Sequence, residues 1–285
     1  MNASMLFVPG TSPDRYLKAQ AGTAGALILD LEDSVPKASK SEARSNVVDM
    51  LSAQPAHQQV WVRVNPASSQ LLLADLAAVV SAKPFGILLP KCSGRKSLIT
   101  VCHYLDALET AAGIELGQTK ILPIVTETAE SMFHLGEFAG STSRLWGLTW
   151  GGEDLSADIG AINNKEGGRY TEPYRLARSM CLYAAAAARV RAIDTVSVAI
   201  NQPDLVRAES AESFRDGFVG KMAIHPSQLA SINETFCYSN EQIAWAQKVV
   251  AALGCRNGSG AVQLDGQMID EPHLVIAHRI LGDGA

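Results

Sequence analysis

Residues 26–33 of the chain read Ala-Leu-Ile-Leu-Asp-Leu-Glu-Asp, a short apolar run that ends in carboxylates. A nearly continuous apolar run of this length is typical of a parallel strand that helices cover on its outer face. Seven further runs have the same character, and segments with helical patterns separate most of them. They are residues 5–9, 60–64, 86–90, 121–125, 145–150, 192–198 and 218–224.

Helix signals stand between these runs. Ser12-Pro13 has the pattern of an N-cap followed by proline at the first helical position. Residues 39–42 have the spacing of a capping box, and residues 98–112 and 173–191 have helical length and periodicity. Eight strands with intervening helices predict an α/β fold, a (β/α)₈ TIM barrel. A doubly wound open sheet is the alternative, and the absence of GxGxxG after the first run weakens its dinucleotide-binding version.

The pattern changes after about residue 236. A helical segment at 240–253 precedes a glycine-rich stretch at 254–266, and a short helix is expected after Pro272. We therefore expect a barrel over residues 1–236 and a C-terminal helical extension over residues 237–285.

Composition excludes several classes of protein. The formal net charge is −5 and Lys and Arg form no block, so we expect no binding to nucleic acid or to a membrane. The first ten residues lack the features of a signal peptide, and the alanine-rich run 182–190 is too short to span a bilayer. The five cysteines show no CxxC pairing, as is usual for free thiols in a reducing compartment. These features predict a cytoplasmic protein.

Polar or ionisable residues follow almost every expected strand, where a TIM barrel places its active site. They are Asp30, Glu32, Asp33, Arg63, Asn65, Lys91, Glu127, Glu153, Asp154, Asp194, Lys221 and His225. Taken singly, Asp33 and Asp154 fit helix N-caps, Asp194 fits a brace of the barrel interior, and His225 fits a structural hydrogen-bonding residue. Taken together, carboxylates and cations at one mouth are costly unless they are paired or bind a metal.

Carboxylates without His or Cys partners suit a hard cation, Mg²⁺ or Mn²⁺. We choose Glu127 and Asp154 as its direct ligands. Asp30, Glu32 and Asp33 would hold the waters on the metal. Arg63 would clamp a carboxylate of a small anionic substrate, for which its planar fork is suited.

Several segments are recognisable as motifs. Glu127-Thr128 and residues 151–156 (Gly-Gly-Glu-Asp-Leu-Ser) look like metal-site motifs, with a slight variation before Glu153. The remaining motifs are residues 6–10 (Leu-Phe-Val-Pro-Gly), 29–35 (Leu-Asp-Leu-Glu-Asp-Ser-Val), 63–65 (Arg-Val-Asn), 221–226 (Lys-Met-Ala-Ile-His-Pro) and 266–272 (Gly-Gln-Met-Ile-Asp-Glu-Pro). Together they resemble, nearly end to end, the citrate lyase β-subunit-like (CitE-like) branch of the HpcH/HpaI aldolase superfamily.

The resemblance implies a TIM barrel with Mg²⁺ on Glu127 and Asp154, and with Arg63 on the substrate carboxylate. It implies reversible cleavage of a β-hydroxyacyl-coenzyme A, such as malyl-, citramalyl- or citryl-CoA, to acetyl-CoA and a 2-oxo acid. It also implies a homo-oligomer, commonly a trimer or hexamer, in which Asp270 reaches the site of a neighbouring subunit and exchanges a proton with the enolate carbon. Asp270 otherwise fits a surface N-cap.

Further roles follow from the same resemblance. Phe7, Pro9 and Arg15 are the candidate contacts to coenzyme A. Glu32 and Asp33 join Arg63 and Asp270 as the candidate catalytic residues. Lys91 fits either a partner of the nearby carboxylates, which we favour, or a Schiff-base nucleophile.

Several alternatives remain open at this stage. The same site could serve a coenzyme A-independent aldolase acting on an acetylpyruvate-like keto acid, or an acyl-CoA thioesterase. The chain could also be the obligate β subunit of a multi-subunit citrate lyase, with an acyl carrier protein and a transferase subunit. A purely structural or binding role is disfavoured because the candidate metal ligands and Arg63 are all present.

Overall fold

The computed structural model describes residues 2–55, 58–254 and 260–282. The chain divides into two compact units, residues 1–236 and 237–285. Eight strands form the sheet of the first unit. They are β1 (Ser4–Pro9), β2 (Ala26–Asp30), β3 (Gln59–Arg63), β4 (Gly86–Leu89), β5 (Lys120–Pro123), β6 (Gly147–Thr149), β9 (Arg191–Asp194) and β10 (Gly220–Ala223).

The sheet closes on itself. Its order is β5-β4-β3-β2-β1-β10-β9-β6, and every neighbouring pair is parallel. Two parallel bridges, Ile121 with Leu145 and Ile124 with Thr149, join β5 to the β6 side. The predicted TIM barrel is therefore confirmed, and the open-sheet alternative is wrong.

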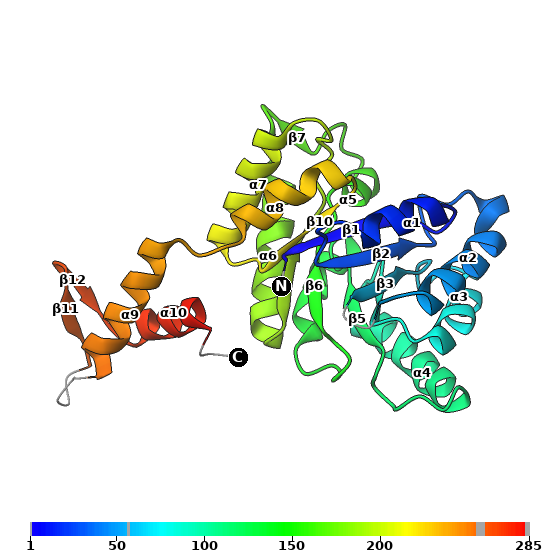
Figure 1. Ribbon diagram of the computed structural model, residues 1–285, viewed down its shortest axis with the longest axis horizontal. Helices are drawn as coiled ribbons and strands as arrows, with labels where there is room; N and C mark the ends of the chain where they lie inside the picture. The colour runs from blue at the N-terminus through cyan, green and yellow to red at the C-terminus, as the bar shows by residue number, and fades with distance from the viewer. Residues whose placement is uncertain (1, 56–57, 255–259, 283–285) are drawn as a thin grey trace. The chain divides into compact units, whose positions relative to one another are not determined.

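Helices surround this barrel, and Figure 1 shows α1 to α4 along the outside of β1 to β5. They are α1 (Pro13–Gln20), α2 (Lys40–Ser52), α3 (Leu72–Val79), α4 (Arg95–Ala111), α5 (Glu153–Asp158), α6 (Glu172–Ala188), α7 (Pro203–Asp216) and α8 (Leu229–Thr235). Five 3₁₀ turns are η1 (Lys37–Ser39), η2 (Val80–Ala82), η3 (Glu130–Phe133), η4 (Leu135–Phe138) and η5 (Pro226–Gln228). A hairpin of β7 (Lys165–Glu166) and β8 (Arg169–Tyr170) precedes α6. Among the described residues, no helix has both the length and the apolar character needed to cross a membrane.

The two predicted helix starts differ from expectation in their hydrogen bonding. Pro13 is the first residue of α1 after Ser12, as predicted, but the Ser12 side chain makes no capping bond. The capping box at residues 39–42 is wrong, because the Ser39 side chain does not cap α2. The 3₁₀ turn η1 runs directly into α2 at this point, and Ser39 has nearly helical backbone angles instead of the extended ones of a cap.

Side chains alternate between the inside and the outside of the barrel. Ile28 on β2 and Trp61 on β3 belong to the interior cluster, together with Met5, Leu88, Leu122, Ile124, Ile193 and Met222. Leu27 and Leu29 belong instead to the cluster that includes the surrounding helices. Both faces are apolar, which explains why the strand sequences show continuous apolar runs.

The second unit has a small core of its own. It contains α9 (Asn240–Gly254), the hairpin of β11 (Val262–Leu264) and β12 (Gln267–Ile269), and α10 (Glu271–Leu281). Residues from all but β11 bury side chains together: Ala246, Val249, Leu253, Ile269 and Ala277. The two helices were predicted. The hairpin was not, and the preceding residues 255–259 of the glycine-rich stretch lie outside the described residues.

The closed barrel predicts a steric requirement at Gly86, where β4 passes Trp61. A Cβ at Gly86 would lie 2.4 Å from Trp61 Cζ3 and 2.7 Å from the Lys120 carbonyl oxygen. We expect Gly86→Ala to lower the free energy of unfolding by about 1–3 kcal/mol, measured by urea denaturation, because overpacking strains a dense core. Gly136→Ala is the matched control, since nothing lies within 4 Å of its added Cβ. Equal midpoints for the two variants would contradict the packing of Trp61 in the barrel.

Candidate active site

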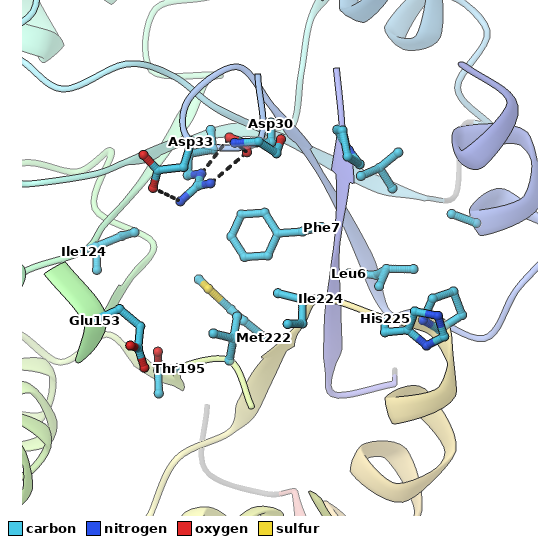
Figure 2. A pocket seen from close by; sticks show the side chains of 18 of the residues that line it. Leu6, Phe7, Asp30, Asp33, Ile124, Glu153, Thr195, Met222, Ile224 and His225 are labelled. Carbon is cyan, nitrogen blue, oxygen red and sulfur yellow. Dashed lines mark hydrogen bonds and ion pairs between the residues drawn. The ribbon is translucent and has the colours of Figure 1, made fainter. Parts of the chain in front are cut away.

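A cavity of about 670 Å³ opens at the carboxyl ends of the barrel strands. Loops after β2, β5, β6, β9 and β10 contribute to its lining, as do β1 and α1. In Figure 2, Phe7 lies between the Asp30 and Asp33 side of the cavity and the Met222 side. This is the face on which TIM barrels carry their active sites.

Arg63 is held on one wall by carboxylates. Its Nε and Nη2 atoms each donate to Asp30 at 2.7 Å, and its Nη1 atom lies 3.0 Å from Glu32 Oε2 and 3.5 Å from Asp33 Oδ2. Burial raises the pKa of Asp30, but the bonds from Arg63 outweigh it and leave this pKa below its ordinary value. Strand alternation explains the pair, because Asp30 is two residues after Ile28 and Arg63 is two residues after Trp61.

Phe7 gives the guanidinium a second support. Its ring lies 4.8 Å from the Arg63 Cζ atom, within the range of a cation–π contact. Asp30, Glu32 and Phe7 therefore contact the guanidinium of Arg63 from three directions and fix its orientation. Such a fixed fork suits planar recognition of a carboxylate.

Lys91 connects two of the predicted site carboxylates. Its ammonium lies 2.8 Å from Glu32 Oε1 and 3.0 Å from Asp154 Oδ1. Burial lowers the pKa of Lys91, but the bond to Glu32 outweighs it, so this pKa stands above its ordinary value. A lysine that holds its proton so firmly is a poor nucleophile, so the ion-pairing prediction is confirmed and a Schiff base is disfavoured.

The backbone of Lys91 has a separate function. With φ at +50° it is in the left-handed region, which side chains other than glycine rarely adopt. Its amide N–H donates to Glu127 Oε2 at 2.6 Å. The unusual backbone therefore brings a donor to a carboxylate that is 5% exposed.

Glu127 and Asp154 are the candidate metal ligands. Burial raises the pKa of Glu127 to about 8; the Lys91 amide opposes the shift, and the negative charge of Asp154 adds to it. Gly151 lets the Glu127 side chain approach, since a Cβ at Gly151 would lie 2.9 Å from Glu127 Cγ. Asp154 stands in the first turn of α5, whose N-cap is Gly152.

The carboxylates of Glu127 and Asp154 are the metal donors that this cavity offers. Within the described residues, no group of three His, Cys, Asp or Glu side chains is placed to hold a metal ion by itself. Two carboxylates are nevertheless the usual protein share of a Mg²⁺ site, in which water and substrate fill the other positions. A cation beside Glu127 would also offset the burial and repulsion that raise its pKa. The residues present therefore fit a hard divalent cation.

Asp194 and Lys221 do not reach this mouth, contrary to the predicted convergence, and the alternative that Asp194 braces the barrel interior is also wrong. Ile193 and Met222 face the interior, so their neighbours Asp194 and Lys221 face outward. The two side chains pair with each other at 2.9 Å behind the strands and line a different cavity. The alternation of apolar residues along β9 and β10 could have shown this from the sequence.

The other predicted residues have the following places. Phe7, Pro9 and Arg15 line the active-site cavity, as does His225. His225 is also the N-cap of η5 and accepts a bond from the Ser227 amide, which fits a structural histidine. Sequence reasoning missed Lys18, Trp150 and Thr195, which also line the cavity and carry no motif signal of their own.

Asp270 belongs to the second unit. It is the N-cap of α10, and its carboxylate pairs with His273 Nδ1 at 2.7 Å. The surface N-cap that the sequence offered as the simpler interpretation is therefore present. It does not exclude a second use of this partly exposed carboxylate.

A family model described as HpcH/HpaI aldolase/citrate lyase matches residues 3–226. This chain belongs to the HpcH/HpaI aldolase/citrate lyase family. The match spans every cavity residue named above, whereas Asp270, a residue of the second unit, lies beyond it.

Individual relatives of the family match along nearly the whole chain. The chain is 33% identical to a (3S)-malyl-CoA thioesterase of Cereibacter sphaeroides, over 98% of this chain and 93% of the relative. It is 30% identical to the mitochondrial citramalyl-CoA lyase of Rattus norvegicus, over 98% and 84%. Among solved structures, CitE from Mycobacterium tuberculosis in complex with magnesium, acetoacetate and coenzyme A is 30% identical, with a TM-score of 0.83 and coverage of 99% and 97%.

The raised pKa of Glu127 predicts how stability depends on pH in metal-free buffer. Between about pH 4.5 and 8 the folded protein holds a proton that the unfolded chain has released, so the free energy of unfolding falls as pH rises through this window. Glu127→Gln removes the titrating group. We expect the fall in the free energy of unfolding across this pH window to become smaller by on the order of a few kcal/mol. Urea denaturation with EDTA measures this, with the exposed Glu172→Gln as control. A wild-type profile that is already flat would contradict the assigned burial.

Proposed function

We propose that this protein is a Mg²⁺-dependent carbon–carbon lyase that cleaves a β-hydroxyacyl-CoA to acetyl-CoA and a 2-oxo acid. One observation carries the proposal: the buried carboxylate Glu127, with Asp154, shares a single cavity with the fixed guanidinium of Arg63. Family membership supports a lyase, and the relatives named for CoA thioesters support the substrate class. The acyl group is proposed to resemble malyl, citramalyl or citryl.

Glu127 and Asp154 would hold the metal, for which Mn²⁺ is a chemical substitute. When bound, Mg²⁺ would act as a Lewis acid and a template for the developing 2-oxo acid. The Lys91 amide and Gly151 keep Glu127 in place for this task. Lys91 also supplies positive charge beside Asp154. The solved structure of CitE from Mycobacterium tuberculosis is a complex with magnesium, and this supports the choice of metal.

Arg63 would bind the carboxylate of the substrate. Asp30 holds two of its nitrogens and orients the fork, which lowers the entropy cost of alignment. Its Nη1 atom faces Asp33, which is 60% exposed and 3.5 Å away, a weaker partner than Asp30. A substrate carboxylate would replace Asp33 at this nitrogen. Glu32 completes the arrangement because it contacts both Arg63 and Lys91.

The coenzyme A portion would follow the cavity past β1 toward α1. Phe7 and Pro9 line this path, and Arg15 and Lys18 add two cations from α1. Phosphate groups of coenzyme A would be attracted to these cations. The volume of about 670 Å³ is within the range of sites that enclose small ligands.

Proton transfer is the task proposed for Asp270. Within the cavity of the first unit, Asp30 and Glu32 are held by cations, and Glu127 is reserved for the metal. Asp270 is partly exposed; it would take up the proton that the substrate hydroxyl loses as the carbon–carbon bond breaks and deliver it to the enolate carbon. We propose that it acts from a neighbouring subunit of a homotrimer or hexamer. A cytoplasmic location is proposed with it.

A second candidate is hydrolysis of the thioester. The relative named as a malyl-CoA thioesterase is 33% identical to this chain and supports it. In that reaction a water molecule would attack the thioester carbonyl of the bound substrate, and the C–S bond would break to release the free acid and coenzyme A. The coenzyme A-independent aldolase and the obligate citrate lyase subunit are the remaining outcomes of the test.

A turnover assay followed by mass spectrometry tests the function. The panel holds malyl-, citramalyl- and citryl-CoA, free citrate and acetylpyruvate, each with Mg²⁺ or EDTA. We expect Mg²⁺-dependent release of acetyl-CoA from one thioester, and Asp154→Asn should lower kcat by about 100-fold or more because a metal ligand is lost. Asp204→Asn, which is exposed on α7, is the control.

Each other outcome has a distinct meaning. Free coenzyme A without any acetyl-CoA would assign a thioesterase, and cleavage of a free acid alone would assign a coenzyme A-independent aldolase. Silence across the panel, rescued by an acyl carrier protein and a transferase subunit, would assign an obligate subunit. Full activity of Asp154→Asn would remove Asp154 from the metal site.

Complementation tests the role of Asp270 in trans. Arg63→Gln and Asp270→Asn should each be inactive alone, because each site then lacks one essential group. After subunit exchange of an equal mixture, about one site in four would combine an intact Arg63 with an intact Asp270 from a neighbour, and activity should return to that level. An exchanged mixture that stays inactive would show that both residues serve from the same chain.

A further inference from the structure

A second cavity, of about 480 Å³, lies behind the barrel strands β9 and β10. It is lined by α6, α7 and the β7–β8 hairpin, and it shares no lining residue with the active-site cavity. The outward-facing residues Asp194 and Lys221 form part of its wall. The proposed lyase mechanism uses none of its residues.

The floor of this second cavity is a fully partnered buried carboxylate. Asp194 accepts bonds from Trp150 Nε1 at 2.6 Å, from Lys221 Nζ at 2.9 Å and from the Ser213 hydroxyl. Burial raises the pKa of Asp194, but the charge of Lys221 outweighs it, so this pKa stays below its ordinary value. The floor is therefore a rigid, ionised platform.

The charge of the second cavity opposes that of the whole chain. Its lining holds six basic side chains, Lys165, Arg169, Arg175, Arg178, Arg215 and Lys221, against four carboxylates, while the chain carries a net charge of −5. Four of the six are paired with those carboxylates, namely Lys165, Arg178, Arg215 and Lys221. The excess positive charge lies at the exposed rim.

Two arginines at the rim are available to a ligand. Arg169, on β8, has no carboxylate partner anywhere in residues 2–55, 58–254 and 260–282. Within the part of the chain that the structure describes, Arg175 on α6 pairs only with Glu172, an exposed residue of its own helix that does not line the cavity. Arginine forks bind phosphate and carboxylate oxygens through paired hydrogen bonds.

The hairpin connects the second cavity to the metal-site loop. Tyr170, on β8, packs edge-on against Trp150 with ring centroids 5.0 Å apart. A Cβ at Gly152 would lie 3.4 Å from the rings of both Tyr170 and Trp150. Trp150 lines the active-site cavity, and Gly152 is the N-cap of the helix that carries Asp154. Tyr170 therefore joins the wall of the second cavity to the backbone that precedes Asp154.

We propose that the second cavity binds a small anion with two or three negative charges on phosphate or carboxylate oxygens, and that binding adjusts the Asp154 loop. Arg169 and Arg175 would make the direct contacts. The anion would hold the hairpin against α6 and α7 and so fix the Trp150–Tyr170 contact. The regulatory part rests on the proposed lyase function, whereas the binding part does not.

Binding is measured by calorimetry on the full chain, freed of metal with a chelating resin, with inorganic phosphate and with tricarballylate as separate probes. The indole N–H of Trp150 donates to Asp194 on the floor of the second cavity, so its signal, assigned with Trp150→Phe, detects binding in a parallel NMR titration. Because Trp150 also lines the active-site cavity, the variants below decide which cavity is occupied. We expect at least one probe to bind and to shift this signal. Arg169→Gln/Arg175→Gln should weaken binding by about 10-fold or more, because two charge-assisted contacts are lost.

Three variants separate the two cavities. Arg63→Gln and Arg15→Gln/Lys18→Gln alter the active-site cavity and should leave this binding unchanged. Arg95→Gln/Arg207→Gln removes two arginines that line neither cavity and is the matched control for lost charge. The proposal is overturned if neither probe binds, or if the active-site variants abolish binding that the Arg169/Arg175 variant retains.

The effect on turnover is measured separately, once a substrate is known. The bound anion should change the Mg²⁺ concentration that gives half-maximal activity at least about 2-fold in wild type, and not in Arg169→Gln/Arg175→Gln, whose basal activity stays normal. Binding without such a change would overturn the regulatory part. Because binding is measured without substrate, failure of the lyase assignment would leave the binding result intact.

Discussion

The two-residue alternation of side chains along closed parallel strands is the constraint on which both cavities depend. In β2 and β3 the inward positions continue from Ile28 to Asp30 and from Trp61 to Arg63, so an apolar interior turns into a paired ionic site at the mouth. In β9 and β10 the polar residues occupy the outward-facing positions, because their neighbours Ile193 and Met222 face the interior. Asp194 and Lys221 therefore leave the barrel and form a second ionic centre behind it. A shift of one residue in either strand would exchange the two environments.

The active site carries more negative than positive charge. Among the described residues, the ion-pair or close electrostatic partners of five carboxylates are Arg63 and Lys91. The carboxylates are Asp30, Glu32, Asp33, Glu127 and Asp154. Burial of such an excess is unfavourable, and Glu127 shows the effect in its raised pKa. A divalent cation relieves this repulsion and at the same time makes the cavity acceptable to an anionic substrate. The excess of carboxylates thus accounts for the proposed metal requirement.

Much of the fold and of the site was predictable from local pattern. The eight apolar runs each became a strand, since burial on both faces leaves a continuous signal that short polar loops interrupt. Asp30, Arg63 and Lys91 were found because polar residues at strand ends converge. The outward direction of Asp194 follows from its neighbour Ile193, which faces inward, but the prediction from strand ends did not take this alternation into account. The β11–β12 hairpin was missed because three-residue strands beside a glycine-rich stretch carry almost no periodic signal. The role proposed for Asp270 came from the family resemblance, because no local pattern encodes a contact with a neighbouring subunit.

The left-handed backbone at Lys91 limits which residues can replace it in this site. Glycine would adopt the same backbone without strain but would remove the ammonium that links Glu32 to Asp154. Asparagine tolerates the conformation yet is neutral and too short. Arginine would keep the charge but carries a planar fork in place of a compact ammonium. Position 91 therefore tolerates few substitutions, because each replacement that suits the left-handed backbone removes the compact positive charge, and the replacement that keeps the charge changes its shape.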